Sequence, residues 1–421
     1  MIYLDYNATT PLCEAARTAM QPFLEEKFGN PSSVHAAGRE ARAAIDDARD
    51  RLADLLGAKP HELIFTSGGT EANNLAILGL ARSRATRGRH LISPKTEHHA
   101  VLNTIEHLEK REGFDVTWLN VSNTGRIDLD QLADTIRDDT VLVSIMHANN
   151  ETGVIQPLRE ISEICRAHGV LLHSDMVQSF GKISIDDNCP NQPVIPSAVE
   201  GSRGSYLEGF AAGSLESGRD GLGSLVDAAS FAAHKFYGPK GAGLLFLRSG
   251  IPIEPVHFGG AHENQRRPGT ENVAAIAGMA AAAEFVERDR EQEQAREGSL
   301  RDQLWREISV QISPAVLNGD ARRRLANTLN ISLPVLDSET MLMALDLEGV
   351  CASSGSACMV GSVIASHVLL AMGLPLALAR SAIRFSIGKY TTEEEISATA
   401  GIVSEIVQRT NAKRSEKTVP V

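Results

Sequence analysis

Residues 140–175 read TVLVSIMHANNETGVIQPLREISEICRAHGVLLHSD, and this stretch holds two apolar runs with a helical pattern between them. The runs cover 140–147 and 170–175. The apolar side chains between them recur at helical spacing, at Leu158, Ile161, Ile164 and Cys165. That spacing predicts a helix with one apolar face. Strands of continuous apolar residues separated by a helix indicate a parallel sheet whose two faces are both covered.

The same alternation extends from Glu62 to Arg248. The further apolar runs lie at 62–66, 90–93, 116–121, 228–233 and 243–247. Upstream, apolar residues at steps of four and three predict an amphipathic helix, and these are Ala41, Ile45, Ala48, Leu52 and Leu55. The sequence therefore predicts an α/β fold with a mainly parallel sheet sandwiched by helices.

The pattern changes after Val273. A helix that begins there is followed by mixed strands at 329–336 and 382–388 and by a final helix near 392–410. This change predicts a second, smaller α+β domain. The last eleven residues, NAKRSEKTVPV, are expected to form a loose tail.

A length of 421 residues is about two to three times that of a usual single domain. We expect a large domain over 15–291 and a small domain over 1–14 plus 292–421. The large domain contains a stretch, 188–224, in which 16 of 37 residues are Gly, Ser or Pro. A disordered surface insertion is the favoured interpretation because the stretch lacks periodicity, and a lid or partner-docking loop is the alternative.

Composition excludes several classes of protein. Lys and Arg number 41 against 53 Asp and Glu, and the formal net charge of −12 argues against a nucleic-acid or anionic-membrane surface. The longest apolar stretch, Val273 to Ala283, is shorter than the about 20 residues that a membrane span needs. The N-terminus shows no secretory signal, and the five cysteines form no C-x-x-C pair. We therefore expect a cytoplasmic protein with reduced thiols.

Three polar segments follow predicted strands. Lys235 lies in AHKFYGPKG (233–241), Asp175 ends the strand 170–175, and a Gly turn precedes the helix that opens at Glu71. Taken singly, each has an ordinary explanation: a solvated cation, a capping or paired carboxylate, and a turn needed only for steric reasons. Together they supply an amine for a Schiff base, a carboxylate for a pyridinium nitrogen and a helix N-terminus for a phosphate. These are the requirements of pyridoxal 5′-phosphate.

Ten motifs occur in order along nearly the whole chain. They are YLDYNATTP, GNPSSVHAAGREAR, FTSGGTEANNLAI, TEHHAV, HANNETG, HSDMVQS, AHKFYGPKG, RPGTEN, SSGSAC and IRFSIG. In these motifs the chain resembles the cysteine desulfurases of the NifS/IscS type, in the class V aminotransferase-like group of fold-type I pyridoxal phosphate enzymes. The resemblance implies the fold of a fold-type I pyridoxal-phosphate-dependent transferase.

The resemblance assigns the cofactor site residue by residue. Lys235 matches the lysine that binds the cofactor covalently, Asp175 the carboxylate beside the pyridine nitrogen, and His98 the imidazole stacked on the ring. Asn150 and Gln178 match the residues hydrogen-bonded to the phenolic oxygen. The phosphate is expected to be held by Gly69, Thr70 and His234, and by Thr270 from a second subunit of a homodimer. Relatives often have a serine where this chain has Ala232, so one phosphate contact is expected either to be missing or to be supplied by Ser230 or water.

The resemblance also assigns the substrate site. Arg384, together with Asn150, matches the residues that bind the substrate, and a guanidinium suits a carboxylate because its planar fork donates two parallel hydrogen bonds. Cys358 matches the nucleophile, with His98 as acid and base. A lone cysteine is most often a small buried residue, which is the interpretation for Cys351, but SSGSAC is small, polar and flexible. The residues after Cys358 are more apolar than in relatives, which puts loop mobility and partner choice in doubt.

The implied activity is the pyridoxal-phosphate-dependent removal of sulfur from L-cysteine, which yields L-alanine and a persulfide on Cys358. The sulfur passes to an acceptor, such as an iron–sulfur cluster scaffold or a thiolation protein. No spacing links the cysteines to histidines as metal ligands, so no metal site is expected. Alternatives are a selenocysteine lyase or related class V aminotransferase-like enzyme and a non-catalytic sulfur carrier or iron–sulfur module. A nucleic-acid-binding role is the weakest.

Overall fold

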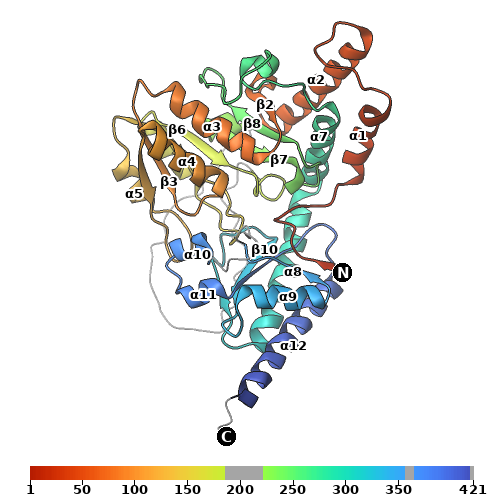
Figure 1. The fold of residues 1–421 in the computed structure, drawn as a ribbon, viewed down its shortest axis with the longest axis vertical. Helices are drawn as coiled ribbons and strands as arrows, with labels where there is room; N and C mark the ends of the chain where they lie inside the picture. Colours follow the sequence, from red (N-terminus) through yellow and green to blue (C-terminus); the bar gives the residue numbers. More distant parts are fainter. Residues whose placement is uncertain (185–220, 356–364, 418–421) are drawn as a thin grey trace, which may run out of the picture.

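The computed structural model describes residues 1–184, 221–355 and 365–417. The predicted stretch at 188–224 lies outside these residues except for its last four, of which Leu222–Ser224 form a short 3-10 turn, η2. Figure 1 shows a large sheet with its helices in the upper half and a smaller group of helices and strands below, with the N-terminus at the right edge of the lower group. In the described part of the chain, no helix is both long enough and apolar enough to cross a bilayer.

A seven-stranded sheet forms the upper half, in the order β2-β8-β7-β6-β5-β3-β4. Its strands are β2 (Leu63–Thr66), β3 (His90–Pro94), β4 (Asp115–Leu119), β5 (Thr140–Ser144), β6 (Leu171–Asp175), β7 (Ala228–Ala232) and β8 (Gly243–Leu247). The pairs from β4 through β7 are parallel, and β8 runs antiparallel to both β7 and β2. The mainly parallel sheet predicted from the sequence is confirmed.

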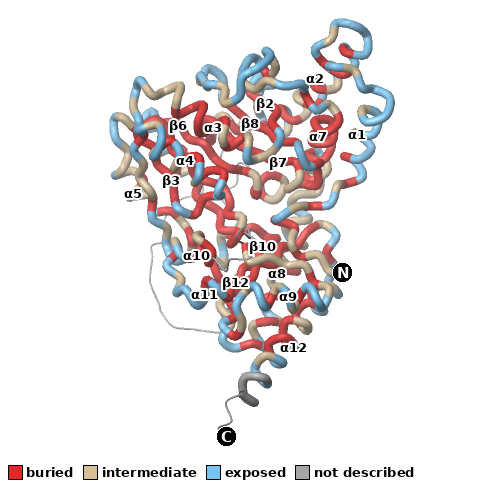
Figure 2. The backbone as a smooth tube through the Cα atoms, viewed as in Figure 1, coloured by how far each residue is buried: buried red, intermediate tan, exposed pale blue. Residues whose placement is uncertain are grey.

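Helices cover both faces of this sheet. On one face lie α3 (Gly69–Ser83) and α4 (His99–Glu112), and on the other lie α2 (Ala36–Leu56), α5 (Leu129–Thr135), α6 (Leu158–Ala167) and α7 (Val273–Arg288), with α1 (Glu14–Glu25) beside α7. Successive strand residues serve opposite faces, so Leu63 and Phe65 join one core while Ile64 joins the other. Figure 2 shows the buried positions running through these strands.

The smaller α+β domain packs around its own core. Its sheets are β12-β10-β9 and β1-β11. The strands are β1 (Ile2–Tyr3), β9 (Val316–Leu317), β10 (Thr328–Ser332), β11 (Val350–Cys351) and β12 (Ala382–Ser386). The helices are α8 (Arg290–Gln311), α9 (Ser338–Leu347), α10 (His367–Ala371), α11 (Leu376–Arg380) and α12 (Glu393–Lys417). One apolar cluster joins α8, α9 and α12 to β10 and β12.

The C-terminal prediction is partly wrong. Helix α12 continues to Lys417, so residues 411–417 are helical and do not form a loose tail. The physical reason is local composition, because Ala, Lys, Arg and Glu in this segment favour helix and the first proline comes only at Pro420.

Candidate active site

The carboxyl ends of the parallel strands meet at one edge of the large sheet, where they build a cavity of about 430 Å³. Asp175 ends β6, and Lys235 lies in the short 3-10 turn η3 (Ala233–Lys235) that follows β7. Gly69 opens α3 after β2, His98 caps α4 after β3, and Asn150 follows β5. All five line the cavity. Five loops that are distant in sequence therefore converge on one site, as is typical of open α/β sheets.

The ammonium of Lys235 is held against the N-terminal segment. Its Nζ donates to the carbonyl oxygens of Asn7, at 2.7 Å, and Ala8, at 2.8 Å. The pKa of Lys235 is lowered to about 8, chiefly by burial and also by the nearby Arg384 cation, while Asp5 and Asp175 oppose the shift. A substantial fraction of this amine is therefore neutral and nucleophilic near physiological pH.

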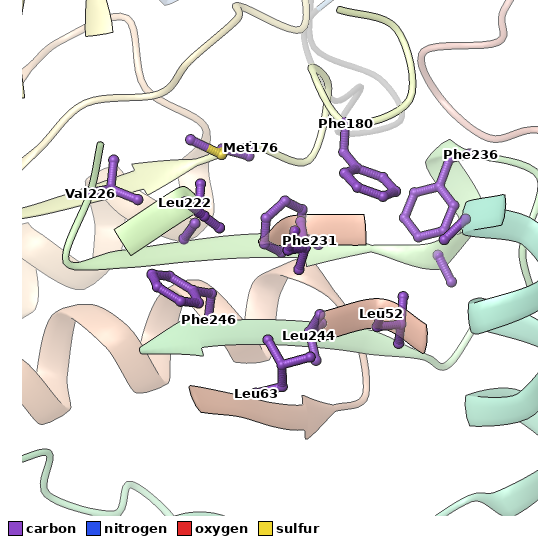
Figure 3. Packing of buried hydrophobic residues seen from close by; sticks show 14 of the residues in the cluster. Leu52, Leu63, Met176, Phe180, Leu222, Val226, Phe231, Phe236, Leu244 and Phe246 are labelled. Atoms are coloured by element: carbon purple, nitrogen blue, oxygen red, sulfur yellow. The ribbon is translucent and has the colours of Figure 1, made fainter. Parts of the chain in front are cut away.

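Two contacts fix the turn that carries Lys235. Tyr237 adopts a positive φ of 66°, and its backbone N–H donates to the hydroxyl of Thr10 at 2.7 Å. Beneath the turn, Phe180 packs edge-on against Phe231, with ring centroids 5.4 Å apart, and against Phe236, at 4.9 Å. Figure 3 shows these three rings together near the end of β7. A tyrosine keeps a left-handed backbone conformation only where its surroundings stabilise it. The packing around Tyr237 therefore fixes the turn that carries Lys235.

The Asp175 carboxylate is oriented by two donors. Asn73 on α3 donates from Nδ2 to Asp175 Oδ2 at 2.7 Å, and the backbone N–H of Val177 donates to Oδ1 at 2.9 Å. Asp175 is 6% exposed. A buried, fixed carboxylate at this place can accept a hydrogen bond from a protonated ring nitrogen.

The N-terminus of α3 forms the end of the cavity suited to an anion. The first N–H groups of a helix have no intrahelical acceptor and carry the positive end of its dipole. A Cβ at Gly69 would lie 2.8 Å from Val177 Cγ2, so the close approach requires glycine. His234 lines the same cavity, with its Nδ1 3.2 Å from the hydroxyl of Thr9. Burial, aided by the Lys235 cation, lowers the pKa of His234 to about 4, which leaves it neutral.

The ring of His98 faces the cavity. Its Nδ1 accepts a hydrogen bond from the backbone N–H of Ala100 at 3.1 Å, so the proton of the neutral ring is on Nε2. The pKa of His98 is lowered, chiefly because the surrounding protein displaces water. Asp175 opposes that shift, whereas the cation of Lys235 adds to it.

Arg384 brings the small domain into the site. It lies in β12, is 3% exposed and donates to the carbonyl of Asn150 at 2.8 Å and to Asp5 Oδ1 at 2.7 Å. Its Nε has no partner among the described residues. Arg384 lines the same cavity as Lys235.

Among the residues named from the sequence, Thr270 and Ser230 do not line this cavity, and Cys358 lies outside the described residues. Thr270 is not among the residues that line this cavity, since it is exposed in a separate surface hollow that also includes Thr70. Ser230 does not replace the missing serine, because its hydroxyl lies 3.0 Å from His173 Nε2 inside the sheet. Cys358 lies outside the described residues, but Ser353 and Gly355 before it and His367 after it all line the cavity.

Two asparagines of the site escaped the sequence analysis. Asn7 belongs to the quoted YLDYNATTP motif, and its carbonyl and side chain contact both halves of the molecule. Asn73 lies one turn into α3, in a helix whose other buried residues are apolar or small. The available signal was a polar residue on an otherwise apolar helix face, and its partner Asp175 is 102 positions away.

The donor set fits pyridoxal phosphate. A buried amine of lowered pKa, a fixed carboxylate and a helix N-terminus with a required glycine all face one cavity. No group of three or more metal-ligating side chains occurs in the described ranges.

The aminotransferase class-V family model matches residues 2–188 and 223–399. The chain is 45% identical over 408 residues to the cysteine desulfurase IscS of Dictyoglomus turgidum, covering 97% of this chain and 95% of that protein. It is 39% identical over 408 residues to the cysteine desulfurase IscS of Methanosarcina thermophila, covering 97% of this chain and 92% of that protein.

Solved structures agree. A "NIFS-LIKE PROTEIN" superposes with a TM-score of 0.83 at 34% identity, covering 97% of this chain and 99% of that one. The structure titled "SspA in complex with cysteine" superposes with a TM-score of 0.75 at 32% identity, covering 93% of this chain and 100% of that one. The chain belongs to the aminotransferase class-V family of pyridoxal phosphate enzymes and, within it, to the cysteine desulfurases of the NifS/IscS type.

Proposed function

We propose that the cavity described above converts L-cysteine to L-alanine and transfers the sulfur to Cys358. The observation that carries this proposal is the meeting of Lys235, Asp175 and Arg384 in one cavity whose wall also contains Gly355 and His367, the described neighbours of the segment with Cys358. The substrate class is supported by similarity to the proteins named above.

The proposed cofactor contacts rest on the family resemblance and on the convergence of these side chains on one cavity. Lys235 would hold pyridoxal phosphate covalently, and Asp175 would pair with the ring nitrogen. When bound, the cofactor supplies an electron-accepting ring that stabilises negative charge on the substrate's Cα. His98 would lie against the ring, Asn150 and Gln178 would contact its phenolic oxygen, and the N-terminus of α3 at Gly69 and Thr70 would hold the phosphate with His234.

The pKa of Lys235 gives a first prediction. The neutral amine is the form that reacts with an aldehyde, and its fraction increases as pH rises through about 8. Cofactor uptake by the apoprotein should therefore accelerate with a midpoint near pH 8, measured as the rate at which the visible absorption band appears. A midpoint near 10.5, the ordinary value for lysine, would contradict the buried environment assigned to this amine.

Arg384 is proposed to bind the substrate carboxylate. Replacement by lysine keeps the charge but removes the fork that makes two parallel hydrogen bonds. We expect Arg384→Lys to raise KM for L-cysteine by about 10- to 100-fold, since a hydrogen bond to a charged group contributes on the order of 1.5–3 kcal/mol. Steady-state kinetics measure this, and an unchanged KM would place the carboxylate elsewhere. Arg380→Lys, a neighbouring exposed arginine, is the control.

Lys235 and His98 are proposed to move the protons. Lys235 would accept the Cα proton of the bound substrate, because its lowered pKa makes the neutral amine more available than in an ordinary lysine. His98, with its proton on Nε2, donates to the departing product. These roles assign one base and one acid to the same cavity.

Cys358 is proposed as the sulfur acceptor. It lies three positions after Gly355, so an extended chain can carry its thiol roughly 10 Å from the cavity wall. Its thiolate attacks the substrate sulfur, the carbon–sulfur bond breaks with its electrons remaining on carbon, and protonation gives alanine. One cysteine and one thiol thus become one alanine and one persulfide, and no external oxidant is consumed.

We further propose a homodimer in the cytoplasm that delivers sulfur to an acceptor such as an iron–sulfur scaffold. Thr270 and Phe258, which is 88% exposed, line the same hollow as Thr70, so this surface suits contact with a second subunit that adds Thr270 to the phosphate site. A reducing compartment suits a reactive thiol. We propose domain limits of 15–291 for the large domain and 1–14 plus 292–421 for the small domain.

One assay tests the reaction. Purified protein loaded with pyridoxal phosphate is incubated with L-cysteine and a thiol reductant, and alanine and sulfide are measured. Equal yields of the two products are expected. Production of pyruvate and ammonia in place of alanine would overturn the proposed activity, because the same cavity would then catalyse an elimination.

A further inference from the structure

Lys182 lies four residues after Gln178, outside the segments assigned a role above. It is half-buried, and its Nζ donates to Gln178 Oε1 at 2.8 Å and to Asn7 Oδ1 at 3.3 Å. Asn7 is 1% exposed and is also the residue whose carbonyl accepts from Lys235 at 2.7 Å. Lys182 and Lys235 are therefore connected through one asparagine.

Gln178 lies between two groups that fix the direction of its amide. The carbonyl of Asn7 can only accept, and it receives Gln178 Nε2 at 2.9 Å. The ammonium of Lys182 can only donate, and it binds Gln178 Oε1. If the amide of Gln178 were flipped, its NH₂ group would face the Lys182 ammonium and its oxygen would face the carbonyl oxygen of Asn7. Both hydrogen bonds would then be lost.

We propose that Lys182 is a positioning residue that holds Gln178 so that its amide nitrogen is directed to the cavity as a hydrogen-bond donor. The nitrogen has two protons, and one is used by Asn7. The second remains for a ligand, since Gln178 lines the cavity and is 5% exposed. The ammonium thus acts on the ligand through the glutamine, without touching it.

One carboxyl group near Lys182 favours its charged form. Lys182 shares a small cavity of about 30 Å³, behind Lys235, with the buried carboxyl of Glu297 on α8. Burial lowers the pKa of Lys182 and raises that of Glu297, while each group favours the charged form of the other. The cations of Lys235 and Arg384 further disfavour a charged Lys182. Glu297 is therefore the group that offsets them.

The consequence for the ligand rests on the proposed function, in which Gln178 contacts the phenolic oxygen of pyridoxal phosphate. A donor at that oxygen stabilises its deprotonated form. Loss of the orienting ammonium should therefore raise the pH at which the visible absorption of the bound cofactor changes. A role confined to folding would change the thermal midpoint and leave this spectroscopic midpoint alone.

The test measures that spectroscopic midpoint in cofactor-loaded variants. Lys182→Met should raise it by about one pH unit, which corresponds to about 1.36 kcal/mol. Lys182→Arg, which keeps a charged donor, should restore it to within a few tenths of the wild-type value. Lys389→Met is the matched control, because it removes another ammonium from the same cavity, one whose Nζ lies 3.3 Å from Asp289.

The Gln178→Ala background separates orientation from charge. There, Lys182→Met should cause no further change, and an equal change in both backgrounds would show that the ammonium acts by its field alone and overturn the proposal. An unchanged midpoint in Lys182→Met, with wild-type absorption and alanine formation intact, also overturns it but leaves the proposed function standing. Absence of any absorption band from the wild type would instead contradict the proposed function. If Lys182→Met does not fold, Lys182→Gln takes its place, because its shorter side chain also withdraws the ammonium from Gln178.

Discussion

Lys235→Ala is expected to lower the rate of alanine formation by about 10³-fold or more, because it removes both the covalent attachment of the cofactor and the base that accepts the Cα proton. The same side chain donates hydrogen bonds from Nζ to the carbonyl oxygens of Asn7 and Ala8. Absorption spectroscopy should show no protein-bound visible band after gel filtration, and amino-acid analysis should detect alanine only at background level.

Lys240→Ala is the matched control for this substitution. Lys240 lies five residues further along the same motif and is exposed, outside the residues that line the cavity. It should retain both the absorption band and near-wild-type turnover. A Lys235→Ala protein that keeps the covalent band would show that another amine binds the cofactor, and the assignment of the whole cavity would fail.

Cys358→Ser should lower alanine formation on a similar scale, on the order of 10³-fold, for a different reason. Serine has nearly the same size but is a much weaker nucleophile toward sulfur, since its hydroxyl is not ionised near neutral pH. The visible band of the bound cofactor should remain, because Lys235 and Asp175 are untouched. Rapid mixing with L-cysteine should still change the spectrum, while no persulfide accumulates on the protein.

Cys351→Ser tests whether the effect belongs to one thiol. Cys351 pairs with Tyr3 in the β1–β11 sheet and is half-buried, away from the cavity residues. It should keep most of the activity and lose at most some stability. Full turnover by Cys358→Ser, or an equal loss in both variants, would remove Cys358 from the proposed mechanism.

The sheet was predictable from local sequence because its strands are buried on both faces. Runs such as 140–147 and 243–247 contain few polar residues, and the intervening helices carry a clear apolar stripe. The strand at 329–336 ends early, at Ser332, because Pro334 cannot continue a ladder. Helix α12 extended further than expected since nothing in 411–417 stops a helix.

The site was predictable to the extent that it follows strand ends. Lys235 and Asp175 were accessible to sequence analysis because each directly follows an apolar run, and Arg384 through its motif alone. The supporting residues were not, since Asn7, Asn73 and Lys182 act through partners that only the folded chain brings together. The sequence also could not show that Ser230 is no phosphate contact. Strand alternation does not reveal that the Ser230 hydroxyl is hydrogen-bonded to His173 inside the sheet.

The N-terminal segment has a consequence for how the enzyme is made. Ile2 pairs with Val350, Asn7 donates to Thr328, and Asp5 accepts from Arg384. These partners lie 321 to 379 residues further along the chain, so they leave the ribosome long after the segment itself. The acceptors that hold Lys235 are therefore fixed only after Arg384 has been synthesised, so vitamin B6 loading is expected to follow the synthesis of both domains.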